Sequence, residues 1–131
     1  MNSTLRTEAA SSPTARGRIL VVEDDQDTAL FLTHVLESRG QFAVTHTPDP
    51  AAALALVVDE PWHLVVTDLE LPGMNGLELV AALRRLVPWL PVLLVTPHAT
   101  GVQGIDYPVL TMPLRVEELL ATVTALIGDA R

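Results

Sequence analysis

Acidic side chains and one hydroxyl follow three short apolar runs of the sequence, and they are the residues best suited to chemistry. They are Glu23, Asp24 and Asp25 after the first run, Asp68 after the second and Thr96 after the third. Carboxylates packed within a few ångströms repel one another, and either raised pKa values or a bound divalent cation relieves that cost. An all-oxygen cluster suits Mg²⁺. Such a metal would cancel charge on a phosphoryl donor, so that a carboxylate could attack as nucleophile and form an acyl phosphate, with Thr96 donating a hydrogen bond to it.

Helix capping is the simpler explanation for part of this acidic cluster. Asp25 and Asp27 precede an apolar pattern of helical spacing, and aspartate is a common N-cap residue. We favour capping for these two. Capping does not require Glu23, Asp24 and Asp68, which stand at the ends of two different strands, so we assign these three to a site.

Two kinds of segment alternate along the chain and must position these residues. Short buried strands are predicted at Ile19–Val22, Phe42–Thr45, Leu64–Thr67, Val92–Val95 and, weakly, Val109–Thr111. Helices are predicted at 28–39, 48–59, 77–86 and 116–127. This alternation predicts an α/β fold with a parallel sheet covered on both faces. Ligands bind at the carboxyl ends of such strands, where the acids and Thr96 should converge.

The composition limits what the chain can bind. Its 131 residues, 49% of them hydrophobic, suit one folded domain. Sixteen acids against eight arginines give a net charge of −8, which repels phosphate backbones and anionic membranes, so direct nucleic-acid binding is not expected. No apolar stretch reaches the roughly 18 residues of a membrane span. The absence of cysteine excludes disulfides and thiolate chemistry and fits a cytoplasmic location.

The ends of the chain differ from its middle. The first residues are polar and lack the apolar core of a secretion signal. We expect residues 1–17 to form a disordered tail, residues 18–128 to form the folded domain, and residues 129–131 to form a short tail. No linker toward an output domain is visible, so we expect a stand-alone domain.

Three segments resemble the signature segments of the receiver domain of bacterial two-component response regulators. They are ILVVEDD from Ile19, LVVTDLELPGMNGLEL from Leu64 and PVLLVT from Pro91. The segments occur in the family's order on the matching predicted elements, and the resemblance spans about residues 18–128. It implies a flavodoxin-like, doubly wound, five-stranded parallel sheet with strand order 2-1-3-4-5.

The resemblance also implies a role for each site residue. Asp68 matches the phosphoacceptor, Glu23 and Asp24 match the metal-binding acid pair, Glu70 sits where the family lends a backbone carbonyl to the metal, and Thr96 matches the switch hydroxyl. Of the acid pair, Asp24 is favoured as the direct ligand. The implied cofactor is Mg²⁺, and the implied partners are a histidine kinase or phosphotransfer protein and an output protein that the sequence does not name. The sequence leaves open whether the domain forms a homodimer.

Two departures from the family concern the residues of its usual switch. Met112 stands before Pro113 where the family has a lysine, and methionine offers neither charge nor donor. A cis Met112-Pro113 bond is still expected, as in the family's Lys-Pro. Only residues 97–107 separate Thr96 from the weak fifth strand, so the fourth helix should be shortened or lost. Val109 takes the aromatic switch position, and Tyr107 is expected to be a half-buried loop residue.

Three functions are compatible with these residues. The leading hypothesis is a stand-alone receiver of a phosphorelay that accepts a phosphoryl group on Asp68 with Mg²⁺ and signals through protein contacts, with no enzymatic activity beyond its own phosphorylation and dephosphorylation. The alternative is a pseudo-receiver, an interaction module independent of phosphorylation. A Mg²⁺-dependent phosphatase ranks well below, because its second aspartate and its distant lysine are absent.

Four further residues are expected to be structural. His34 and His46 have no second metal ligand at a suitable spacing, so surface or packing roles are favoured. Trp62 and Trp89 each stand next to a proline just before a strand, which favours anchoring of loops over ligand binding.

Overall fold

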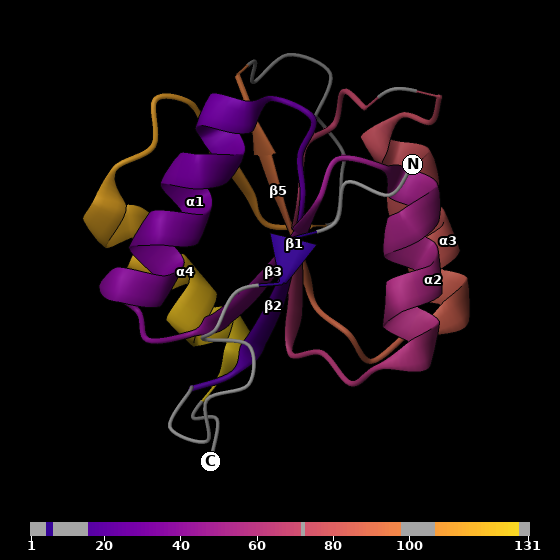
Figure 1. Ribbon diagram of the computed structural model, residues 1–131, viewed down its shortest axis with the longest axis horizontal. Helices are drawn as coiled ribbons and strands as arrows, with labels where there is room; N and C mark the ends of the chain where they lie inside the picture. The colour runs from indigo at the N-terminus through magenta and orange to yellow at the C-terminus, as the bar shows by residue number, and fades with distance from the viewer. Residues whose placement is uncertain (1–4, 7–15, 72, 98–106, 129–131) are drawn as a thin grey trace.

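A single sheet runs through the middle of the molecule (Figure 1). The computed structural model describes residues 5–6, 16–71, 73–97 and 107–128. In this part of the chain the sheet has the order β1-β3-β2-β4-β5-β6. Its strands are β1 (Leu5–Arg6), β2 (Arg18–Val22), β3 (Ala43–Thr47), β4 (Leu64–Thr67), β5 (Val92–Thr96) and β6 (Val109–Thr111). The strands β2 to β6 are mutually parallel, which confirms the predicted five-stranded sheet and its order.

Helices cover both faces of the sheet (Figure 1). They are α1 (Gln26–Ser38), α2 (Pro50–Asp59), α3 (Gly76–Leu86) and α4 (Val116–Ile127). α1 and α4 lie on one face, and α2 and α3 lie on the other. The predicted α/β class is therefore confirmed. Among the described helices, none combines the length and the apolarity that crossing a membrane requires.

β2 shows why a buried strand appears in the sequence as a continuous run of apolar residues. Ile19 and Val21 pack into the core beneath α1 and α4, whereas Leu20 and Val22 pack into the core beneath α2 and α3. Successive side chains of a strand point to opposite faces, so a strand covered on both faces needs apolar residues at every position. The apolar run of β2 ends at Val22, and the acids of the predicted site begin at the next residue.

The N-terminal segment differs from the expectation of a tail outside the fold. Leu5 and Arg6 pair antiparallel with β3, opposite His46 and Thr45 respectively. Arg16 donates its backbone N–H to the carbonyl of Gln41 at 2.9 Å. The expectation thus does not hold for these residues, because the edge of β3 offers unpaired backbone groups to any extended segment. Residues 1–4, 7–15 and 129–131 lie outside the described part.

Two predictions concern the region after β5. The Met112-Pro113 peptide bond is cis, as expected. The expectation of a shortened or lost fourth helix concerns residues 98–106, which lie outside the described residues. Tyr107 is half-buried in a bend, as predicted, and its hydroxyl accepts a hydrogen bond from the Arg84 guanidinium at 3.0 Å.

Candidate functional site

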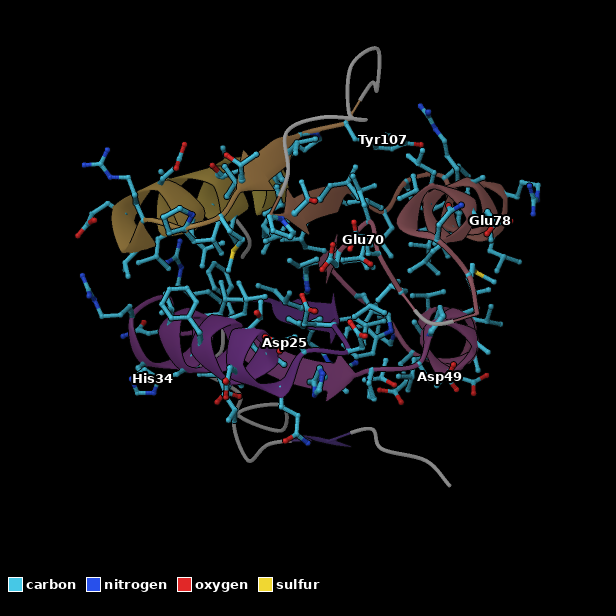
Figure 2. All side chains as sticks on the ribbon, turned by 90° about the horizontal axis from the view of Figure 1, so that it is seen from above. Asp25, His34, Asp49, Glu70, Glu78 and Tyr107 are labelled. Atoms are coloured by element: carbon cyan, nitrogen blue, oxygen red, sulfur yellow. The ribbon has the colours of Figure 1, made fainter. Side chains whose placement is uncertain are left out.

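A pocket of about 220 Å³ opens at the carboxyl ends of β2, β4 and β5. It is lined by Glu23, Asp25, Thr28, Asp68, Val95, Pro97 and Met112. Register brings the strand ends together, because Val22 is the partner of Thr67 across β2 and β4. Of the residues predicted for the site, Glu23 and Asp68 line this pocket. In the view of Figure 2, Glu70 lies between the two helix layers and Asp25 lies at the start of α1.

Glu23 is the most deeply buried acid of the site, with 3% of its surface exposed. Burial raises the pKa of its carboxyl group to about 7, and the charges of Asp68, Asp24 and Asp25 add to that rise. The backbone N–H of Asp25 donates to Glu23 Oε2 at 3.1 Å, and this hydrogen bond offsets part of the rise in the pKa. The protein alone therefore compensates the ionised form of Glu23 only in part.

Asp68 is half-buried and follows β4 directly. Burial raises the pKa of its carboxyl group, and the nearby charges of Glu70 and Asp24 act in the same direction. The backbone N–H of Glu70 donates to Asp68 Oδ1 at 3.1 Å, which lowers the pKa in part and fixes the orientation of the carboxylate. One oxygen is held in this way, and the side chain as a whole faces the pocket.

Asp24 and Glu70 lie at the margin of the site. Both side chains are exposed, and both are close enough for their charges to raise the pKa of Asp68. Within the described residues, no group of three or more His, Cys, Asp or Glu side chains is arranged to hold a metal ion. The acids thus do not form a complete cage. Mg²⁺ needs none, because it accepts one or two carboxylates and keeps several waters. Glu23 and Asp68 fit that requirement.

Asp25 has the capping role expected for it. Its carboxylate accepts hydrogen bonds from the backbone N–H of Thr28 at 2.9 Å and from the Thr28 hydroxyl at 2.6 Å. These two bonds lower the pKa of Asp25. Asp27 lies in the first turn of α1, where a negative charge favours the helix. Asp25 also lines the pocket, as its place after β2 predicts, and so does Thr28, which the sequence analysis did not identify.

Thr96 and Met112 belong to neighbouring strand ends. Thr96 is buried at the end of β5, and its carbonyl accepts a hydrogen bond from the backbone N–H of Met112 at 2.9 Å. Met112 is partly buried and forms the wall of the pocket together with Val95 and Pro97. Met112 therefore gives the pocket an apolar wall at this strand end.

Gly76 shapes the loop that carries Asp68, and the sequence analysis did not identify it. Its backbone N–H donates to the Leu69 carbonyl at 2.6 Å. A Cβ atom at this position would collide with the Asp68 carbonyl and would lie 2.5 Å from Leu69 Cα. Asn75 and Glu78 fix the start of α3 beside it through a reciprocal capping box. The turn LPGMNG contained the signal, since glycine allows close backbone approach.

His46 supports the site from β3, through a contact with Glu23 that the sequence does not reveal. It lies in β3 and is half-buried. Its Nε2 is 2.8 Å from the carbonyl oxygen of Glu23, so the ring ties the end of β2 to β3. This is the packing role expected for His46. His34 is exposed on α1, as expected for a surface histidine (Figure 2).

Sequence comparisons match this chain to one family of known proteins. The profile of the response regulator receiver domain matches residues 19–112. The transcriptional regulatory protein TcrA of Mycobacterium tuberculosis is 38% identical over 119 residues, which are 83% of this chain and 45% of TcrA. The response regulator receiver protein CpdR of Brucella abortus is 31% identical over 116 residues, 84% of this chain and 96% of CpdR.

Solved structures show the same fold. The receiver domain of the sensor histidine kinase PA1611 from Pseudomonas aeruginosa PAO1, described with a magnesium ion coordinated in its active-site cleft, has a TM-score of 0.78 and 22% identity. The match covers 86% of this chain and 98% of that domain.

The chain spans about half the length of TcrA and of the transcriptional regulatory protein TctD of Salmonella typhimurium.

Proposed function

Because this chain belongs to the family of response regulator receiver domains, we propose that it accepts a phosphoryl group on Asp68 with the help of Mg²⁺ and signals through protein contacts. One observation carries the proposal. Glu23 and Asp68 line one small pocket, and the pKa of each is raised by burial and by the other acids around it. Two such carboxylates favour a bound cation and leave one of them available as a nucleophile.

The side chains of this chain fit a hard divalent cation. Glu23 and Asp68 would hold Mg²⁺ from the neighbouring carboxyl ends of β2 and β4. Asp24, which is exposed beside them, would complete the acid pair with Glu23. When bound, Mg²⁺ supplies positive charge that offsets the charge of the acids and of an incoming phosphoryl group. The receiver domain of PA1611 is similar in fold only, so the support comes from the acids of this chain.

Asp68 would act as the nucleophile through its carboxylate. One oxygen is occupied by the Glu70 N–H. A carboxylate oxygen attacks the phosphorus of the donor, the bond between phosphorus and the donor's leaving atom breaks, and the leaving group departs with the electron pair. The product is an acyl phosphate on Asp68. Thr96, at the end of β5, would donate a hydrogen bond to a phosphoryl oxygen.

The partners follow from the same proposal. The phosphoryl donor would be a histidine kinase or a phosphotransfer protein, and the receiver of the signal would be a separate output protein. CpdR, which this chain matches over 96% of its length, supports a receiver that works without an attached output domain. We also propose a cytoplasmic location, which the acidic, cysteine-free composition supports. No catalytic activity on other substrates is proposed.

A pseudo-receiver is the second candidate, and Met112 favours it. The wall formed by Val95, Pro97 and Met112 offers the phosphoryl group no positive charge. A charge-assisted hydrogen bond of this kind contributes roughly 1.5 to 3 kcal/mol, so its absence weakens the coupling between phosphorylation and conformation. In this alternative the domain signals by binding alone.

Treatment with acetyl phosphate separates the two candidates. We expect intact-protein mass spectrometry to detect one added phosphoryl group that requires Mg²⁺ and is removed by hydroxylamine. The Asp68→Asn variant should show no adduct, whereas Asp59→Asn, which changes an exposed aspartate at the far end of α2, should behave like the wild type. If the wild type forms no adduct while a typical receiver is labelled in the same buffer, the pseudo-receiver is the correct function.

A further inference from the structure

An apolar groove of about 520 Å³ lies between the C-terminal ends of α2 and α3. Three of the six exposed large hydrophobic side chains in the described part of the chain line it: Val58 at 62% exposure, Leu86 at 47% and Trp89 at 76%. Trp62 lies in the same groove and is buried. Exposed apolar side chains gathered in one hollow indicate an interaction site, whereas single ones do not. We call this hollow the tryptophan groove.

The tryptophan groove has a fixed floor. Trp62 Nε1 donates to the Leu56 carbonyl at 2.9 Å, and the Arg18 guanidinium stacks 4.4 Å from the centre of the Trp62 ring. Arg18 also pairs with Glu60 at 2.6 Å. These contacts hold the loop between α2 and β4 in one position. The expectation that tryptophan anchors a loop is therefore confirmed for Trp62.

Trp89 does not follow that expectation, because three quarters of its surface is exposed. It lies in the short connection between α3 and β5, where Pro88 and Pro91 restrict the backbone and Leu90 N–H donates to the Val87 carbonyl at 2.9 Å. Trp89 and Leu90 also line a second hollow of about 240 Å³ that continues toward Tyr107. The indole is thus presented on a restrained turn between two hollows. Such exposed aromatic side chains commonly dominate binding at protein interfaces.

The tryptophan groove is remote from the phosphoacceptor. Its residues precede β4 and β5, whereas Asp68 and Thr96 stand at the opposite ends of these strands. Four or five residues of strand correspond to roughly 15 Å. A molecule in the groove would therefore leave the pocket around Asp68 open.

Charge indicates the kind of partner. Asp59 and Glu60 line the tryptophan groove, and no arginine is among its lining residues in the described part of the chain. Arg18 offsets the charge of Glu60, so Asp59 is the acid that gives the groove its negative charge. The whole chain carries a net charge of −8, so a second copy would bring the same charge to the contact. A groove between two helix ends also suits a helix laid into it with its apolar face inward.

We propose that the tryptophan groove binds an amphipathic helix of a partner protein whose apolar face is flanked by lysine or arginine. The apolar face covers Trp89, Val58 and Leu86, and the basic flank lies beside Asp59. Binding there is independent of the proposed phosphorylation of Asp68.

The probe is a synthetic peptide of about 15 leucine and lysine residues with all leucines on one helical face. It contains no tryptophan, so the emission comes from Trp62 and Trp89 of the protein. Because Trp62 is already buried, a shift on binding reports coverage of Trp89. We expect a blue shift of that emission and saturable binding by titration calorimetry. A glutamate version of the peptide, and a scrambled leucine-lysine version without an apolar face, should bind at least about tenfold more weakly.

Two variants at similarly exposed positions, together with Trp89→Ser, locate the binding. Val58→Ser lies in the tryptophan groove, and Leu30→Ser lies on α1 at 64% exposure, so both change an exposed position of a helix. We expect Val58→Ser and Trp89→Ser to weaken binding about tenfold, and Leu30→Ser to leave it unchanged. Equal binding to all variants would overturn the proposal, because it would show attraction to net charge only. Preference for the glutamate peptide, or a wild-type dimer in sedimentation that Val58→Ser dissociates, would also overturn it.

Discussion

Replacing Glu23 by glutamine is expected to stabilise the metal-free protein at alkaline pH. Glu23 is 3% exposed, and its pKa rises from the usual 4.5 to about 7 on folding. Each tenfold change in proton affinity corresponds to about 1.36 kcal/mol, so the ionised carboxylate costs roughly 3 kcal/mol in the folded state above pH 8. Glutamine keeps an oxygen that can accept the hydrogen bond from the Asp25 N–H, and it carries no charge.

The pH dependence of this effect has a definite sign. Between about pH 4.5 and 7 the folded protein holds a proton on Glu23 that the unfolded chain has released, so the wild type loses stability as the pH rises through this window. At pH 5 the folded carboxyl is protonated, and the advantage of the Glu23→Gln variant should shrink to below about 1 kcal/mol. At pH 8 the full difference should be present.

Urea unfolding at pH 5 and pH 8 with a chelator measures this difference. Glu117→Gln, at an exposed acid in the first turn of α4, is the matched control and should stay within about 0.5 kcal/mol of the wild type at both values. Saturating Mg²⁺ should stabilise the wild type more than Glu23→Gln. Equal free energies of unfolding for wild type and Glu23→Gln at pH 8 would refute the reasoning that burial of this charge destabilises the metal-free protein.

Three further predictions concern the same site. The melting temperature of the wild type should rise with Mg²⁺, and Asp24→Asn should remove most of that rise; equal melting temperatures of the wild type with Mg²⁺ and with chelator would contradict the metal site. Gly76→Ala should destabilise the protein by roughly 1 to 3 kcal/mol in urea unfolding and slow the phosphorylation of Asp68, because its Cβ displaces the Asp68 carbonyl; wild-type stability and rate would show that the loop adapts. Met112→Lys should enlarge the NMR shifts produced by beryllofluoride, whereas the native chain should change only in the loops after β4 and β5; large native shifts across β5 and β6 would show another route for the signal.

Local pattern was sufficient for the individual strands and for the acids at their ends, whereas the order of the strands came from the family resemblance. A parallel strand buried on both faces, such as Ile19–Val22, is continuously apolar, so its end and the acids that follow are visible in the sequence. Parallel topology then requires the ends of β2 and β4 to meet, which is why Glu23 and Asp68 were identified together.

Features that depend on tertiary contacts could not be predicted in this way. Pairing of Leu5–Arg6 with β3 uses backbone groups and leaves no apolar period in the sequence. The close approach of Gly76 to Asp68 depends on how the loop after β4 meets α3. Trp89 has the same proline context as Trp62, and only the packing of α2 and α3 leaves one indole exposed and buries the other.

The most direct test of the central claim is to locate the acyl phosphate. The protein is incubated with acetyl phosphate and Mg²⁺, reduced with borohydride, which converts a phosphorylated aspartate to homoserine, and digested for peptide mass spectrometry. We predict homoserine in place of Asp68 alone, in amounts that fall to background when Mg²⁺ is chelated. An unmodified Asp68, or equal conversion at Asp24 or Asp59, would contradict the assignment of Asp68 as the phosphoacceptor.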